Sequence, residues 1–256
     1  MPFQKVQPEK LSSSVVRQIE LLILRGILRP GERLPAEREL AERLGVSRPS
    51  LRDAVSELQN KGLLSARAGS GIFVAGVLGS AFSPALTQLF ASHDEAVFDY
   101  LSFRKDMEAL AAERAARFAS DSDLKVVQTI FDKMCTAHCD HDPEEEARLD
   151  AQFHSAIIEA SHNVVMLHMM RSMFDLLREG VFYNRQVMFR QQTTRDELLN
   201  QHRTINDALQ ARDADATREA VIIHLDFVEQ SLMDRKKADA HEEIARQRLD
   251  HETSTR

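Results

Sequence analysis

The sequence predicts a mainly α-helical protein, in which a small module of three helices and a hairpin precedes an all-α helical bundle of about six helices. Eight of the nine glycines lie at or before Gly79, and six of the seven prolines lie at or before Pro84. Strands and tight turns need such residues, so the rest of the chain, rich in Ala, Leu, Glu, Arg and Gln, is expected to be almost wholly helical. Charge changes at the same place: residues 1–78 carry 12 Lys and Arg against 8 Asp and Glu, whereas the remainder is strongly acidic.

Composition excludes several classes of protein. The chain of 256 residues has a formal net charge of −7, and 43% of its residues are hydrophobic, which argues against disorder. It contains no apolar run of 18 residues, and its N-terminus lacks the apolar core of a signal peptide. Two cysteines exclude a disulfide scaffold. We therefore expect a cytoplasmic protein without a membrane partner, organised as residues 1–78, a linker at 79–94, a helical domain at 95–235 and a charged tail at 236–256.

The basic module has the signals of three short helices. Apolar residues recur at helical spacing from Leu11 to Ile23, and Pro30, Gly31 and Pro35 separate them from a second helix, AERELAERL, that stops at Gly45. Ser47 is a suitable N-cap for the third helix. LLSARAGSGIFV then alternates around a Gly-Ser-Gly tip, as a β-hairpin does.

Helix, glycine turn, helix and hairpin together form a winged helix-turn-helix, whose third helix enters the major groove of DNA. Arginines there can bridge guanine O6 and N7, while serine hydroxyls suit phosphates or bases. The alternative to DNA contact is that these arginines only make a small helical bundle soluble. The predicted DNA contacts are Arg38, Ser47, Arg48, Ser50, Arg52, Arg67 and Gly69.

The run PGERLPAERELAERLGVSRPSLR, followed by ARAGSGIFV, resembles the DNA-binding domain of the GntR family of bacterial transcription regulators. The resemblance implies a homodimer bound to double-stranded operator DNA. It departs from the family pattern at Ser70, where many members have a second glycine.

Four residues of the acidic module can form a polar site inside its bundle. Asp150 and His154 are spaced i,i+4, so they project from one helix face. His202 and His224 each stand in line with apolar positions of their own helices. A buried histidine bonded to a carboxylate is the commoner outcome of such a pattern. One Asp and three His also suit a divalent metal ion, with Zn²⁺ expected and Ni²⁺, Mn²⁺ or Fe²⁺ as alternatives.

RKDMEALAAERAA, LDAQFHSAIIEASHN and QHRTINDALQARDADATREAVIIHL together resemble the FCD effector domain of the FadR subfamily. In metal-bearing members, the four ligands match Asp150, His154, His202 and His224. The resemblance also implies an effector-binding role for Arg104 and Glu108, with Arg104 gripping a carboxylate. Lactate, glycolate and pyruvate regulators are the most similar members, and the complete ligand set favours a lactate or glycolate type.

The sequence thus predicts a transcriptional regulator rather than an enzyme, released from DNA when a small carboxylate binds beside the metal. A metal sensor without an organic effector is one alternative, and a metalloenzyme with Glu108 as base is another. A cluster of Cys135, His138, Cys139 and His141 can also be read as a metal or redox site, although reduced thiols on a helix are the commoner case.

Overall fold

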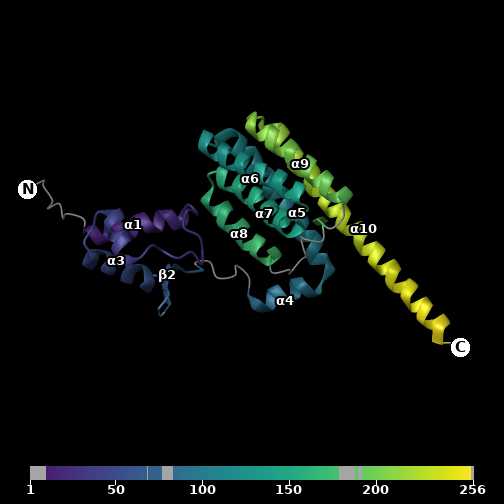
Figure 1. The fold of residues 1–256 in the computed structure, drawn as a ribbon, viewed down its shortest axis with the longest axis horizontal. Helices are drawn as coiled ribbons and strands as arrows, with labels where there is room; N and C mark the ends of the chain where they lie inside the picture. Colours follow the sequence, from purple (N-terminus) through teal and green to yellow (C-terminus); the bar gives the residue numbers. More distant parts are fainter. Residues whose placement is uncertain (1–9, 68, 77–82, 179–187, 190–191, 255–256) are drawn as a thin grey trace, which may run out of the picture. The chain divides into compact units, whose positions relative to one another are not determined.

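The computed structural model describes residues 10–67, 69–76, 83–178, 188–189 and 192–254 (Figure 1). The chain divides into two compact units, Met1–Ala81 and Phe82–Arg256, which are treated separately below. Among the described residues, no helix is both long enough and apolar enough to span a membrane.

The first unit has the predicted order of three helices and a hairpin. Its elements are α1 (Leu11–Leu24), α2 (Glu37–Leu44), α3 (Arg48–Asn60), β1 (Leu64–Arg67) and β2 (Gly71–Val74). The two strands are antiparallel, with Leu64 opposite Val74 and Arg67 opposite Gly71. One apolar core joins them to the helices; it includes Val15, Ile19, Leu51, Leu58 and Val74. The winged helix-turn-helix prediction is confirmed.

The turn between α2 and α3 fixes how the third helix begins. Gly45 ends α2 in the left-handed conformation, with φ at 65°. Ser47 is the N-cap of α3, and its hydroxyl accepts a hydrogen bond from the backbone N–H of Ser50. Both local predictions are therefore confirmed, and together they place the first turn of α3 at the surface.

The second unit is all helical in its described residues. Its helices are α4 (Pro84–Ser92), α5 (Asp94–Phe118), α6 (Asp121–Asp140), α7 (Pro143–Ala160), α8 (Val164–Arg178), α9 (Gln192–Gln210) and α10 (Ala214–Ser254). The predicted bundle of about six helices corresponds to α5–α10. The sequence favours its fourth helix at about 164–188, and residues 179–187 of that range lie outside the described part. α4 falls within the predicted linker 79–94. α10 continues through the predicted tail to Ser254, and its residues 236–253 are exposed.

Small side chains let the helices of this unit approach closely. The main core cluster brings together α5, α6, α7, α9 and α10, and α5 contributes several buried alanines to it. A second cluster surrounds Tyr100 and Leu101 near the start of α5. The polar residues described below lie on the helices that share these two clusters.

Gly45 offers a test of the turn that leads into α3. Replacing it with alanine is expected to destabilise the first unit by about 1–2 kcal/mol, because an L-residue is strained in the left-handed region. A new Cβ meets no atom within 4 Å, so the cost is conformational and not steric. Gly76→Ala is the control, since this glycine has equal space and no positive φ. Urea unfolding of both variants measures the difference, and equal stability would contradict the assigned turn.

Candidate DNA-binding surface and metal centre

The predicted DNA contacts gather around the first turn of α3. Ser47, Arg48 and Arg52 are exposed, and Ser50 is half-buried. Arg38 is exposed on α2. The hydroxyls of Ser47 and Ser50 lie 2.9 Å apart.

Glu37, which the sequence analysis did not single out, organises the two arginines of α3. From the first turn of α2, its carboxylate accepts from Nε of Arg48 at 2.9 Å and from Nε of Arg52 at 3.0 Å. These hydrogen bonds from Arg52 and Arg48 lower the pKa of Glu37. The side chains of Arg48 and Arg52 are 57% and 64% exposed, so both remain accessible from solvent while they contact Glu37. Glu37 is 11 residues from Arg48 and 15 residues from Arg52, and it lies on a different helix. No spacing pattern within one helix could therefore predict these contacts.

Two glycines of the wing have a backbone conformation with positive φ. Gly69 and Gly71 have φ of 69° and 110°, whereas Ser70 is not among the described residues with positive φ. The serine at position 70 therefore requires no strained backbone in this hairpin. The Arg67 guanidinium lies over the ring of Phe73, with Cζ 4.4 Å from its centroid. Arg67 and Gly69 are both exposed at the tip.

In the second unit, the structure brings together all four residues of the predicted metal site. Asp150 and His154 come from α7, His202 from α9 and His224 from α10. Each is at most 5% exposed. One ligand atom from each lies within 4.8 Å of the others. Residues distant in sequence thus converge in the bundle interior.

The distances between the donor atoms suit a first-row divalent metal ion. Oδ1 of Asp150 lies 3.0 Å from Nε2 of His202 and 3.7 Å from Nε2 of His154. The two Nε2 atoms are 3.3 Å apart. Ligands at about 2.0–2.1 Å from one ion are separated by about 2.9 Å at right angles and about 3.3 Å at tetrahedral angles. The donor set and its spacing therefore fit a metal ion.

The histidines differ in the direction of their pKa shifts because they have different neighbours. Burial lowers the pKa of His202 and lowers that of His224 well below its usual value. Burial acts in the same direction on His154, but Glu108 and Asp150 outweigh it and raise the pKa of His154. Neutral imidazoles are the form that binds metal, so His202 and His224 are already in the required state.

Each of two ligands has a partner on its other ring nitrogen. Nδ1 of His154 lies 2.5 Å from Oε2 of Glu108, and Nδ1 of His224 lies 3.1 Å from Oε1 of Gln201. An oxygen at Nδ1 favours the tautomer that leaves Nε2 as the free ligand atom. In His154, this Nε2 is the atom that approaches Asp150 and His202.

Glu108 occupies the centre of the polar network. Its other oxygen accepts from Nε of Arg104, one turn earlier in α5, and both side chains are at most 4% exposed. Burial opposes its ionisation, but Arg104 and His154 prevail and lower the pKa of Glu108 to about 2. The Arg104–Glu108 pair is thus buried and not a pair on the helix surface. A pocket lies beside this network, and Glu108 is not among the residues that line it.

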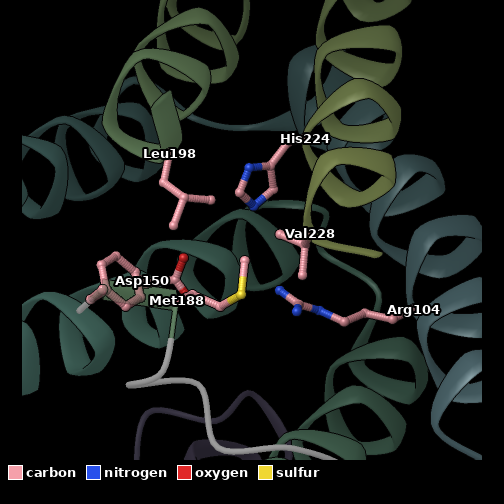
Figure 2. A pocket seen from close by; sticks show the side chains of 7 residues that line it. Arg104, Asp150, Met188, Leu198, His224 and Val228 are labelled. Atoms are coloured by element: carbon pink, nitrogen blue, oxygen red, sulfur yellow. The ribbon is translucent and has the colours of Figure 1, made fainter. Parts of the chain in front are cut away.

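That pocket combines one cation, two of the candidate metal ligands and apolar walls. Figure 2 shows Arg104, Asp150 and His224 directed toward a common space from different helices. The lining residues are Arg104, Asp150, Met188, Phe189, Leu198, His224 and Val228. A guanidinium beside candidate metal ligands provides the elements for recognising a small carboxylate.

The alternative metal or redox site around Cys135 and Cys139 is not formed among the described residues. Cys135 and Cys139 are free thiols on α6, and burial raises the pKa of Cys135. Among the described residues, Asp150, His154, His202 and His224 form the only ligand group of this kind.

Comparison with known proteins identifies both units. Residues 11–74 match the bacterial regulatory proteins of the gntR family, and residues 99–227 match the FCD domain. The fold and these matches define a DNA-binding transcriptional regulator. The chain belongs to the GntR family and carries an FCD domain, as its sequence motifs predicted.

Curated relatives cover most of the chain. It is 38% identical over 227 residues to the putative L-lactate dehydrogenase operon regulatory protein of Escherichia coli K12, covering 87% of this chain and 86% of the relative. It is 31% identical to the Glc operon transcriptional activator of the same strain, covering 86% and 88%. These relatives are transcriptional regulators and not enzymes. A GntR structure from Streptococcus agalactiae shares the fold, with a TM-score of 0.51 at 24% identity over 86% of this chain and 99% of that chain.

The buried Arg104–Glu108 pair provides a stability test. Glu108→Gln is expected to destabilise the metal-free second unit by about 3 kcal/mol, because it leaves the Arg104 guanidinium buried without its counter-charge. Glu113→Gln is the control on the same helix, where the side chain pairs with an Arg117 that is 54% exposed. That change is expected to cost less than about 1 kcal/mol. Equal urea midpoints for the two variants would show that the buried pair does not stabilise the fold.

Proposed function

We propose that this regulator binds its operator as a homodimer and is controlled by a small 2-hydroxy or 2-oxo carboxylate bound at a divalent metal in the FCD domain. The observation that carries the proposal is the convergence of four buried ligands within 4.8 Å beside a pocket that contains Arg104. A relative named for an L-lactate dehydrogenase operon supports this class of acid. Lactate is therefore the first candidate, followed by glycolate and pyruvate.

Asp150, His154, His202 and His224 would hold the ion, and we propose Zn²⁺ as the first candidate. A bound ion supplies positive charge to a carboxylate and to the oxygen on the neighbouring carbon. Arg104 would pair with the same carboxylate, while Leu198 and Val228 would contact the acid's apolar part. Glu108 holds both Arg104 and His154, so it acts behind the pocket and not as a direct effector contact.

On the DNA side, we propose that Arg48 and Arg52 read bases from the major groove, with Ser47 and Ser50 beside them. Arg38, Arg67 and Gly69 would contact the backbone or the adjacent groove. The exposure of Arg48 and Arg52 on α3, of Arg38 on α2 and of Arg67 and Gly69 on the wing supports this assignment. Repression in the bacterial cytoplasm, relieved by the acid, is the proposed direction of control.

Arginine variants test the recognition helix. Arg48→Ala and Arg52→Ala are each expected to lose about 1–3 kcal/mol of discrimination between operator and unrelated duplex, as expected for a bidentate base contact. Arg43→Ala, on α2, removes the same charge from an exposed i,i+4 pair and is the control. Fluorescence anisotropy with a duplex that the wild type selects from a random library provides both affinities. An unchanged affinity ratio in both α3 variants would exclude them as base-reading residues.

Thermal melting tests the effector site. L-Lactate, D-lactate, glycolate, pyruvate and citrate are added to metal-loaded and metal-stripped protein. The cognate acid at 100 times its Kd is expected to stabilise the loaded form by about 2.7 kcal/mol, and to leave the stripped form almost unchanged. Arg104→Lys is expected to retain metal binding but lose most of the response, because lysine lacks the planar fork. Stabilisation by metal with no response to any acid would favour a metal sensor.

A further inference from the structure

A second buried ion pair lies beside the metal ligands and has no assigned role. Arg195, on α9, donates from Nε to the two carboxylate oxygens of Glu146 at 3.0 and 3.1 Å, and from Nη2 to one of them at 2.5 Å. Both residues are 4% exposed. Such two-point pairing constrains the direction as well as the distance of the partners. We call this pair the Arg195–Glu146 clamp.

The clamp joins the same two helices as the ligands Asp150 and His202. Glu146, Asp150 and His154 follow one another at intervals of four residues in α7. Arg195 and His202 are separated by seven residues, or about two turns, in α9. The clamp and the 3.0 Å contact between Asp150 and His202 therefore connect corresponding faces of α7 and α9.

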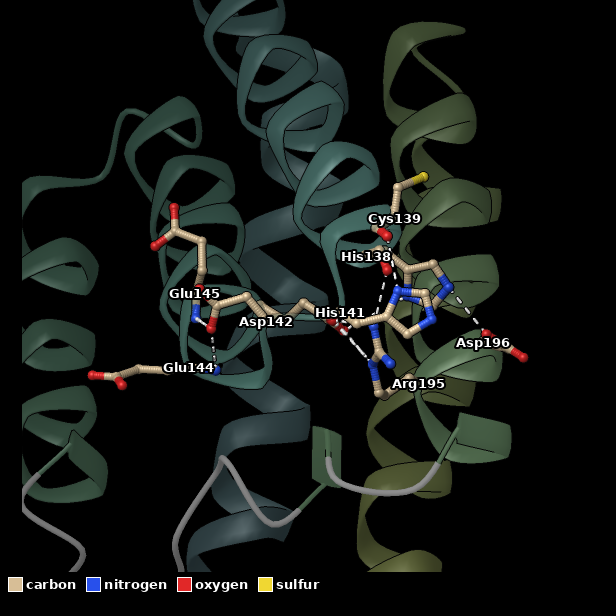
Figure 3. Close-up of polar contacts among 9 residues, drawn as sticks. His138, Cys139, His141, Asp142, Glu144, Glu145, Arg195 and Asp196 are labelled. Atoms are coloured by element: carbon tan, nitrogen blue, oxygen red, sulfur yellow. Dashed lines mark hydrogen bonds and ion pairs between the residues drawn. The ribbon is translucent and has the colours of Figure 1, made fainter.

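The end of α6 holds the clamp from a third direction. Nη2 of Arg195 donates to the backbone carbonyl of His138 at 2.9 Å, and Nε2 of His138 lies 3.0 Å from Oδ1 of Asp196 (Figure 3). Two adjacent residues in the first turns of α9 thus contact the same residue of α6. His138, which the sequence analysis grouped with Cys135, Cys139 and His141, thus helps to hold α6 against α9.

We propose that the Arg195–Glu146 clamp is a positioning device that sets α9 against α7 at the register in which Asp150 and His202 can share one metal ion. The inference rests on the proposed metal site. A buried ion pair contributes little net stability compared with apolar residues of similar volume, but it is far more directional. The clamp's role would therefore appear in metal affinity and ligand geometry rather than in the free energy of unfolding.

The test measures Co²⁺ binding, since the visible spectrum of Co²⁺ reports both affinity and ligand geometry. Arg195→Met is expected to weaken Co²⁺ binding by about 10–100-fold, the loss typical of residues that orient metal ligands. Its bound spectrum is expected to shift, because the ligand geometry changes. Arg171→Met is the matched control. Arg171 lies on α8, and its Nη2 pairs with Oε1 of Glu159 on α7 at 2.6 Å. This control is expected to keep the wild-type affinity and spectrum.

A double variant separates positioning from stability. Arg195→Met alone removes the hydrogen bonds from Arg195 to the buried Glu146 carboxylate and leaves that carboxylate 3.6 Å from Nδ1 of His138, so the variant can lose stability for that reason. Arg195→Met with Glu146→Leu removes both charges, and urea unfolding is expected to show that stability recovers. Positioning predicts that Co²⁺ affinity stays weak in this double variant, whereas a purely structural role predicts that it recovers.

The positioning role would be overturned if both stability and Co²⁺ affinity recovered in the double variant. It would also be overturned if the Arg195→Met variant folded and kept the wild-type Co²⁺ affinity and spectrum. Failure of the wild type itself to bind Co²⁺ would instead overturn the proposed metal site, and the clamp's role with it.

Discussion

The FCD domain is organised around one carboxylate in its interior, that of Glu108. An isolated buried charge is unstable, so an ionised carboxylate persists inside a helical bundle only with opposite charges and hydrogen bonds around it. Arg104 on α5 donates to this carboxylate from Nε, and Nδ1 of His154 on α7 lies 2.5 Å from its other oxygen. His154 in turn faces Asp150 and His202, which extends the polar network to α9. The relative positions of these helices are thus constrained by polar atoms as well as by apolar packing.

The apolar core makes this arrangement possible. Phe153 is fully buried beside His154, and the imidazoles of His154 and His202 both meet its ring edge-to-face, with centroids 6.0 and 5.3 Å away. Buried alanines on α5 allow neighbouring helices to approach closely. Water is largely excluded from the polar network by these contacts, which strengthens each electrostatic interaction within it. Burial in this core lowers the pKa of His202 and of His224, whereas Glu108 and Asp150 raise that of His154.

Local signals account for what the sequence could predict. Gly45 and Ser47 marked the turn and the start of α3 because their conformations are set by near neighbours. The i,i+4 spacing of Asp150 and His154 placed them on one face, and the apolar neighbours of His202 and His224 indicated that these histidines face the interior. The family resemblance then made a metal ion the favoured reading of the four. Contacts between distant elements carried no such signal: Glu37 with the α3 arginines, and Glu108 with His154, arise only once the helices pack. The charged end of the chain, predicted as a solvated tail, continues α10 as an exposed helix to Ser254.

An effector can control DNA binding only if its affinity differs between the arrangements that bind the operator well and poorly. The geometry of the pocket makes such a difference physically plausible, because Arg104, Asp150 and His224 belong to three different helices. A ligand that contacts all three favours the arrangement in which they are correctly spaced. Since linkage is reciprocal, operator DNA must weaken the binding of an effector that weakens the binding of DNA. A tenfold effect in either direction requires a coupling free energy of only about 1.4 kcal/mol, comparable to a single hydrogen bond.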